Sequence, residues 1–118
     1  MRYFSLDEFK CKCCGELPEQ GMSSVLLEKL DTLRGMIGKP IIVTSGYRCP
    51  IHNRNVGGVK SSTHVKGNGV DIVCDVPYSY LVAMVERVGF DGVGLYPEQG
   101  FIHIDCRDEG NSPNTYRW

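Results

Sequence analysis

Two short segments of this chain alternate apolar and ionisable side chains, and this alternation constrains the fold more than any other feature. Segment 70–74 reads VDIVC and segment 101–106 reads FIHIDC. Successive side chains of a β-strand point to opposite faces, so one face of each segment is apolar and suits a core. Asp71, His103 and Asp105 then occupy the opposite faces. If the two strands are neighbours, these three side chains line one surface.

Two helices are predicted from hydrophobic periodicity. Apolar residues recur at the helical period over 26–37, after a serine that can cap the helix and before Gly38, which suits a left-handed C-terminal position. A second helix is predicted to start at Asp75 or Ser79 and to end at Gly89. Each helix has one apolar face, so both are expected to pack on a sheet.

Two further strands are predicted at 41–44 and 93–96, from β-branched and apolar runs. The stretch 45–66 is a long loop that we expect to be functional, because strong elements flank it. Strands and helices mix without a regular βαβ rhythm. This favours an α+β fold with helices on a small, largely antiparallel sheet. The length suits one domain, 1–118, with an irregular cysteine-containing segment at 1–22.

The sharpest local pattern is a histidine seven residues before an aspartate, His64 and Asp71, with Gly67 and Gly69 between them. Ligands on one helix lie about three or four residues apart, so this spacing fits one ligand on a loop and one on the strand that follows. With His103, the chain offers two imidazoles and a carboxylate, a good zinc set that leaves a fourth position for water. Spacing alone also allows the ordinary alternative of unrelated polar residues.

The chain has six cysteines, and three crowd into positions 11–14. They allow three interpretations: buried structural thiols, one or two disulfides, or a second metal site. Cys74 and Cys106 each follow a proposed ligand by three residues on the core side of a strand, so we expect burial and a disulfide is open to them. Cys11, with Cys13 or Cys14, is expected to reach Cys49.

Charge and composition argue against several classes of partner. The net charge is −1, which gives no electrostatic reason to expect nucleic-acid binding. No stretch approaches the roughly 18 apolar residues of a membrane span. The first ten residues are too acidic and polar for a secretory signal, so we expect synthesis in the cytoplasm and action on the cell wall after release or export. We expect a monomer.

The metal pattern and its surroundings resemble the zinc D-Ala-D-Ala carboxypeptidase family, in its compact single-domain subgroup. The motif residues that carry the resemblance are Ser62, His64, Gly67, Gly69, Asp71 and the later His103. Segments 39–53, 92–97, 101–105 and 116–118 are also similar to that subgroup. The resemblance runs in order over about residues 4–118.

The resemblance implies a hedgehog/D,D-peptidase-like fold and one Zn²⁺ held by His64, Asp71 and His103. It implies hydrolysis of peptide bonds in bacterial peptidoglycan stem peptides, of the D-Ala-D-Ala carboxypeptidase type. Arg48 is then expected to hold a substrate carboxylate or the developing oxyanion, and Ser62 to bind substrate or its own loop. The alternatives are a phage-endolysin-like peptidoglycan endopeptidase, a non-hydrolytic zinc-binding module, and a structural zinc domain built on the cysteines.

The chain departs from the family pattern at two glycines. Gly69 stands where the family usually has alanine, and we expect little effect from this difference. Gly100 stands where many relatives carry the catalytic acid. We therefore predict Asp105 as the catalytic base, with two other roles open to it: orienting a ligand imidazole, or pairing with Arg48 or Arg107. Glu98 is the next candidate for the base.

Overall fold

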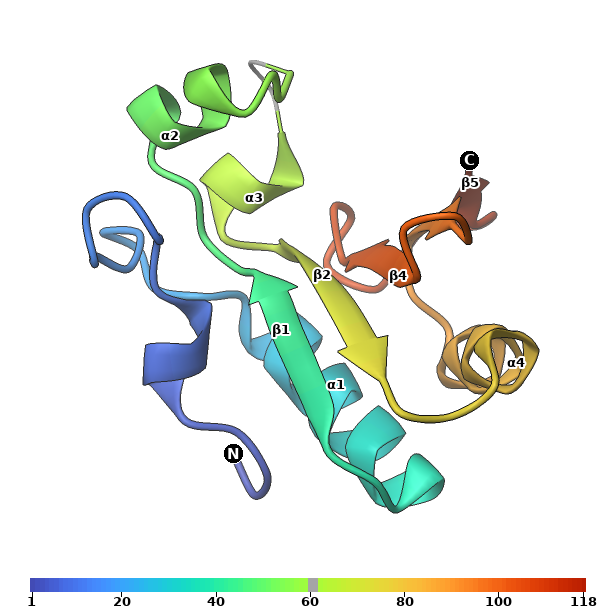
Figure 1. The fold of residues 1–118 in the computed structure, drawn as a ribbon. Helices are drawn as coiled ribbons and strands as arrows, with labels where there is room; N and C mark the ends of the chain where they lie inside the picture. The colour runs from blue at the N-terminus through green and yellow to red at the C-terminus, as the bar shows by residue number, and fades with distance from the viewer. Residues whose placement is uncertain (60–61) are drawn as a thin grey trace.

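The structure is a computed structural model of the chain, and it describes residues 1–59 and 62–118. Its helical elements are the 3₁₀ helix η1 (Leu6–Phe9), α1 (Ser24–Ile37), α2 (Pro50–Asn55), α3 (Thr63–Lys66) and α4 (Tyr78–Val88) (Figure 1). Its strands are β1 (Ile41–Ser45), β2 (Gly69–Cys74), β3 (Gly92–Tyr96), β4 (Phe101–Asp105) and β5 (Tyr116–Arg117).

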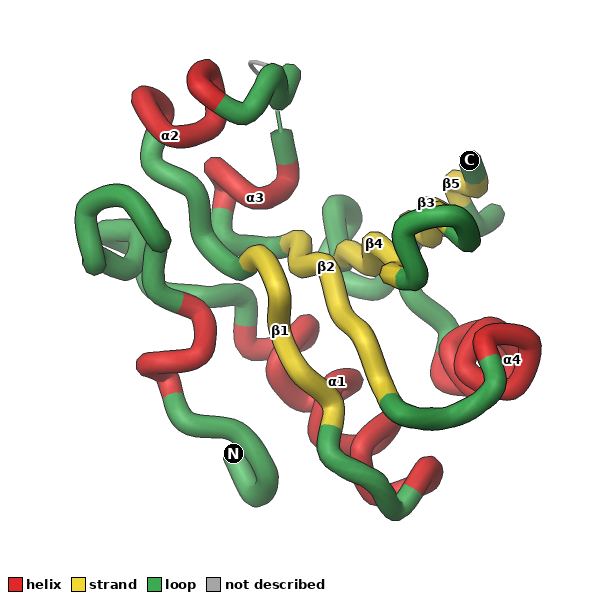
Figure 2. Tube along the Cα trace, in the orientation of Figure 1, coloured by secondary structure: helices red, strands yellow, loops and turns green. Residues whose placement is uncertain are grey.

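The strands form one sheet in the order β1-β2-β4-β3-β5. Every pairing is antiparallel except that of β5, which runs parallel to β3. The helices α1 and α4 lie on the same side of this sheet, whereas α2 and α3 lie beyond the end of β1 (Figure 2). The predicted α+β class with a largely antiparallel sheet is confirmed.

The predicted first helix is α1, and its ends follow from local chemistry. The Ser23 hydroxyl accepts a hydrogen bond from the Leu26 N–H at 3.3 Å, and Gly38 ends the helix at φ 74°. Leu26, Leu30 and Leu33 are fully buried against the sheet. Burying a side chain of this size contributes about 1.5–3 kcal/mol, so this leucine face fixes α1 on the sheet.

Three sequence expectations about irregular segments or boundaries need correction. Segment 1–22 contains η1, whose N-terminus has a capping box between Ser5 and Glu8. The expected loop at 45–66 contains α2 and α3, and a side chain accepts a hydrogen bond at the N-terminus of each, Cys49 for α2 and Ser62 for α3. Positions 60 and 61 of this stretch lie outside the described residues. The helix expected to start at Asp75 or Ser79 begins at Tyr78.

The apolar core face predicted for β2 and β4 is confirmed. Val70 and Ile72 of β2 and Ile102 and Ile104 of β4 are fully buried in the core beneath the sheet.

Among the described residues, no helix is long and apolar enough to cross a membrane.

The register of these strands separates Cys74 from Cys106, between which the sequence left a disulfide open. Val70 lies opposite Ile104, so the two cysteines lie at opposite ends of the paired strands. Cys106 is fully buried, as expected, but Cys74 is only half-buried. Both thiols are free, so the structure does not contain the disulfide that the sequence left open to them.

Candidate metal centre

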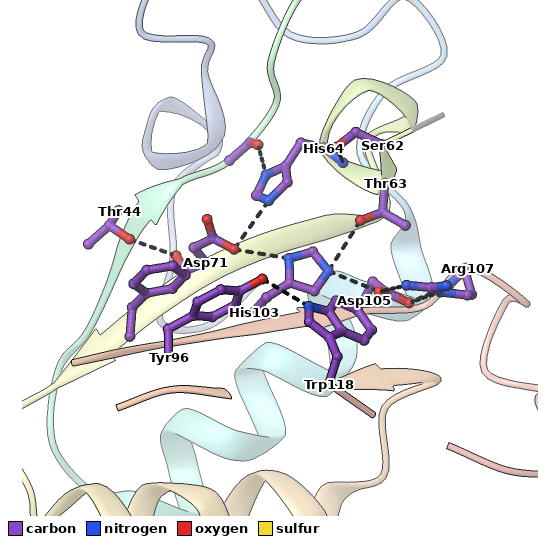
Figure 3. Close-up of polar contacts among 12 residues, drawn as sticks. Thr44, Ser62, Thr63, His64, Asp71, Tyr96, His103, Asp105, Arg107 and Trp118 are labelled. Atoms are coloured by element: carbon purple, nitrogen blue, oxygen red, sulfur yellow. Dashed lines mark hydrogen bonds and ion pairs between the residues drawn. The ribbon is translucent and has the colours of Figure 1, made fainter. Parts of the chain in front are cut away.

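The pairing of β2, β4 and β3 builds the candidate site on the sheet face opposite α1 and α4 (Figure 3). Asp71 of β2 lies directly across from His103 of β4, and His103 lies across from Gly94 of β3. His64 reaches this row from α3, above the sheet (Figure 3). The structure therefore brings together the three residues that were predicted as metal ligands.

A short turn of helix aims His64 at the sheet. The Ser62 hydroxyl accepts a hydrogen bond from the His64 N–H at 3.1 Å, which caps α3, and Gly67 ends the helix at φ 76°. His64 Nδ1 lies 2.8 Å from the carbonyl oxygen of Gly46, just past β1. A carbonyl only accepts, so Nδ1 carries the proton and donates it. His64 Nε2 then faces Asp71 Oδ1 at 3.2 Å with a lone pair.

The orientation of His103 is fixed in a similar way. Its Nε2 lies 2.9 Å from Asp105 Oδ2 and 3.3 Å from the Thr63 hydroxyl. A carboxylate only accepts, so Nε2 carries the proton of the neutral ring. The other ring nitrogen, Nδ1, lies 3.0 Å from the same Asp71 oxygen that faces His64.

The donor set fits a metal ion. His64 Nε2, His103 Nδ1 and an Asp71 oxygen lie within 4.8 Å of one another. In the neutral form of both rings, all three atoms present lone pairs to the same point, an arrangement that a cation stabilises. Two imidazoles and a carboxylate are ligands that zinc uses in catalytic sites. Each imidazole also donates its other N–H to an oxygen, as ligating histidines almost always do.

The pKa values in the metal-free protein reflect this convergence. Burial alone would raise the pKa of Asp71, but hydrogen bonds with His103 and His64 hold it at about 2. Burial alone would lower the pKa of His103, but Asp105 and Asp71 raise it above its ordinary value. In the absence of metal, the two carboxylates therefore favour the protonated form of the His103 ring.

Asp105 is completely buried, whereas the sequence suggested an open cleft face. Its oxygens accept two hydrogen bonds from the Arg107 side chain, at 2.9 and 2.8 Å, besides the contact with His103. Burial alone would raise its pKa, but His103 and Arg107 hold the pKa at about 2. Asp105 faces the edge of His103 away from Asp71. This position favours the orienting role among those considered for Asp105.

Glycines flank the buried carboxylate on both neighbouring strands. The residues across from Asp105 on the two neighbouring strands are Gly69 and Gly92. A Cβ at Gly92 would lie 2.3 Å from an Asp105 oxygen. A Cβ at Gly69 would lie 2.6 Å from the Cβ of Thr63 and 3.2 Å from His103. These contacts argue against the expectation that the glycine at 69, in place of the usual alanine, has little effect.

The centre lies in a cleft of about 860 Å³. The predicted substrate residues Arg48 and Ser62 both line it, as do the three candidate ligands. Burial lowers the pKa of Arg48, although Asp71 opposes this. Its Nε is buried, and no group among the described residues accepts a hydrogen bond from it. Glu98, the second candidate for the base, is exposed in the turn between β3 and β4.

One wall of the cleft comes from a residue that sequence reasoning did not assign. The indole of Trp118 lies 5.2 Å from the His103 ring, and its Nε1 donates a hydrogen bond to the Tyr96 hydroxyl at 2.9 Å. The indole covers Gly94, where a Cβ would lie 2.5 Å from its nitrogen. Arg107 stacks beneath it at 5.2 Å.

Sequence reasoning also missed the Gly46 carbonyl and Thr63, whereas Arg107 was one of the two arginines considered as a partner of Asp105. One signal was present in the glycines of β3. Gly92 and Gly94 are two residues apart in a strand, which places them on one face and marks a close approach of other groups there. The partners themselves come from distant segments, which no local pattern indicates.

Comparison with known proteins shows which family the chain resembles. The family model described as Peptidase M15 matches residues 2–105. The peptidoglycan L,D-endopeptidase MepK of Escherichia coli strain K12 is 36% identical over 90 residues, which cover 68% of this chain and 48% of that protein. The MepK of Shigella flexneri has the same identity and coverage.

A more distant relative is the probable peptidoglycan L,D-endopeptidase MepK of Haemophilus influenzae, which is 33% identical over 82 residues. That match covers 64% of this chain and 44% of the relative. The chain thus spans about half the length of the curated relatives it matches. The match to the family model covers most of the chain and confirms the resemblance to zinc peptidases: this chain belongs to the Peptidase M15 family.

Proposed function

We propose that this chain is a zinc-dependent endopeptidase that hydrolyses peptide bonds in bacterial peptidoglycan stem peptides. The observation that carries the proposal is the convergence of two imidazoles and one carboxylate on a single point in the cleft. The relatives named as peptidoglycan L,D-endopeptidases support the substrate class. They also favour endopeptidase over the D-Ala-D-Ala carboxypeptidase activity that we expected first.

His64, Asp71 and His103 would hold the zinc ion. Zinc bound there supplies a Lewis acid for a peptide carbonyl and lowers the pKa of water at the site. The Gly46 carbonyl keeps Nε2 of His64 turned toward the site, and Asp105 does the same for Nδ1 of His103. These contacts preorganise the ligands, so little reorganisation is needed when the metal binds.

Arg48 would bind the substrate. Its guanidinium lines the cleft beside Asp71 and carries the positive charge that a stem-peptide carboxylate requires. Trp118, with Tyr96 and Phe101, forms an aromatic wall at the cleft, and the latter two rings stack at 4.5 Å. We expect Arg48→Ala to raise KM more than it lowers kcat, because the side chain contacts substrate away from the scissile bond.

The test is incubation of the zinc-loaded protein with purified peptidoglycan and with soluble stem peptides, followed by mass spectrometry. We expect cleavage inside the stem, at a bond between an L- and a D-configured residue. Release of free D-alanine alone would instead indicate the carboxypeptidase. The matched control is the double variant His64→Ala/His103→Ala, which lacks both imidazoles. Bound zinc without any hydrolysis would overturn the proposal in favour of a non-hydrolytic module.

A further inference from the structure

Three cysteines gather at a second place in the molecule, away from the histidine centre. The sulfurs of Cys11, Cys14 and Cys49 lie within 4.8 Å of one another. Cys11 is buried, Cys49 is half-buried and Cys14 is exposed. The expectation that the N-terminal cysteines reach Cys49 is confirmed, but the thiols are free rather than bridged.

The chain around these sulfurs is built as a turn. Segment 11–15 reads CKCCG, and the N–H of Gly15 donates to the Cys11 carbonyl at 2.8 Å. Gly15 has φ 73°, a left-handed conformation that favours glycine. The Cys11 N–H donates to the carbonyl of Glu16 at 2.9 Å, which closes the turn. The turn thereby holds the sulfurs of Cys11 and Cys14, three residues apart, on the same side of the segment.

The third sulfur arrives from the segment after β1. The Tyr47 N–H donates to the Phe9 carbonyl at 2.8 Å, which lays segment 46–49 against the N-terminal segment. The N–H of Cys49 points at Cys11 Sγ at 3.4 Å, and the N–H of His52 points at Cys49 Sγ at 3.4 Å. Backbone N–H groups aimed at sulfur favour the thiolate form, which is the form that binds metals.

We propose that Cys11, Cys14 and Cys49 bind a second zinc ion, which is structural. A zinc–sulfur bond is about 2.3 Å long, so two thiolates on a tetrahedral ion lie about 3.8 Å apart. Each sulfur–sulfur distance in the structure therefore needs to shorten by about an ångström or less for zinc to bind. A disulfide would engage two of the three sulfurs, whereas zinc uses all three. Water or the neighbouring Cys13 thiol completes the tetrahedron.

This ion would fasten the N-terminal segment to the wall of the active cleft. Cys49 directly follows Arg48, whose N–H donates to the His64 carbonyl at 3.2 Å. Gly46, whose carbonyl orients the His64 ring, belongs to the same short segment. Zinc at the cysteines thus holds a segment that contributes to both ligand orientation and substrate binding, without taking part in hydrolysis.

Zinc stoichiometry, measured by elemental analysis of protein purified with a non-chelating reductant, tests the proposal. We expect two zinc ions per chain in the unchanged protein, one in Cys11→Ser/Cys49→Ser and one in His64→Ala/His103→Ala. Cys74→Ser is the matched control and should keep two, because this half-buried thiol lies at the far end of β2. Unchanged zinc in the cysteine variant overturns the proposal, whether or not the protein hydrolyses peptidoglycan.

A second measurement covers the case in which the cysteine variant does not fold. Cobalt added to metal-free His64→Ala/His103→Ala, which retains all six cysteines, should give sulfur-to-cobalt charge-transfer absorption. Its absence refutes the thiolate site. Thiols are also counted in the unchanged protein, unfolded without reductant in the presence of chelator. Six free thiols agree with zinc, and two fewer, with Cys11 and Cys49 missing, indicate a disulfide and overturn the proposal.

Discussion

Asp105 Oδ2 lies 2.9 Å from His103 Nε2, on the edge of the ring opposite the nitrogen that faces Asp71. The carboxylate is wholly buried and is itself held by two hydrogen bonds from Arg107. This chain of contacts runs from arginine to carboxylate to imidazole. It fixes which nitrogen of His103 is available to a metal.

The first prediction concerns Asp105→Asn. The amide is nearly isosteric, so the fold should survive, but it holds the His103 ring less firmly. We expect zinc affinity at the histidine centre to fall about 10–100-fold and activity to recover largely when zinc is in excess. Zinc titration followed by activity assays at saturating metal measures both effects.

A different result would restore the base role that the sequence suggested. If Asp105 is the base, the variant keeps its zinc and loses roughly 10²–10⁴-fold in turnover even at saturating metal. The comparison variant is Glu98→Gln, in the exposed turn. A large loss of turnover there would assign the base to Glu98 instead.

The second prediction concerns the ligands themselves. Removing zinc with a chelator should abolish hydrolysis, and added zinc should restore it. His64→Ala, Asp71→Asn and His103→Ala should each lose zinc from the histidine centre, because three protein ligands leave no redundancy. Gln99→Ala is the control, since Gln99 is exposed in the turn between β3 and β4 and is outside the ligand set. Full retention of zinc in both histidine variants would contradict the assignment.

The third prediction is the acid sensitivity of the metal-free protein. The pKa of Asp105 is lowered from 3.8 to about 2, so its contribution to stability is present above pH 3.8 and is lost as the pH falls through 2. This shift corresponds to about 2 kcal/mol. Protonation of Asp71 acts in the same window, because its pKa is also about 2.

His103 acts with the opposite sign. Its pKa is raised, so its contribution is present below its ordinary pKa and is lost as the pH rises through the raised value. Urea unfolding of the chelated protein between pH 2 and 5 isolates the carboxylates. We expect Asp105→Asn to lose about 2 kcal/mol less than the unchanged protein over this range. Equal losses in the two proteins would show that Asp105 does not contribute.

The fourth prediction is that Gly69→Ala destabilises this chain. The new Cβ would lie 2.6 Å from the Thr63 Cβ, so the start of α3 has to move. We expect a loss of about 1–3 kcal/mol and weaker zinc binding, since Thr63 contacts His103. The control is Gly35→Ala in α1, where the nearest atom is a Tyr3 ring carbon at 3.5 Å. Thermal unfolding that shows both variants equally stable would be the contrary result.

The fifth prediction uses the single tryptophan as a reporter. In Gly94→Ala the added Cβ would lie 2.5 Å from the Trp118 nitrogen and should displace the indole from the cleft wall. We expect stronger quenching of fluorescence by acrylamide and a higher KM. Leu95→Ala, on the opposite face of β3, should leave the quenching unchanged. Identical quenching in Gly94→Ala and the unchanged protein would show that the Trp118 indole does not pack over Gly94 at the cleft wall.

Local patterns in the sequence determined much of the fold. The caps and leucine spacing of α1 and the alternation in β2 and β4 each depend on a few consecutive residues, and all were predicted. The proposal of His64, Asp71 and His103 as ligands followed from the same alternation, from the spacing of His64 and Asp71 and from the family resemblance. These features could be predicted because the interactions that produce them, helix capping and the burial of one face, depend on residues within one or two helical turns or one strand.

Tertiary structure decided the rest. The register that aligns Asp71 with His103 separates Cys74 from Cys106, and no pattern within either strand specifies it. The burial of Asp105, the contact between Thr63 and His103 and the hydrogen bond from His64 to the Gly46 carbonyl arise between segments that only the fold brings together. Side-chain partners, ring orientation and burial depend on the packed environment, because desolvation and hydrogen bonding are properties of the folded molecule rather than of the residue.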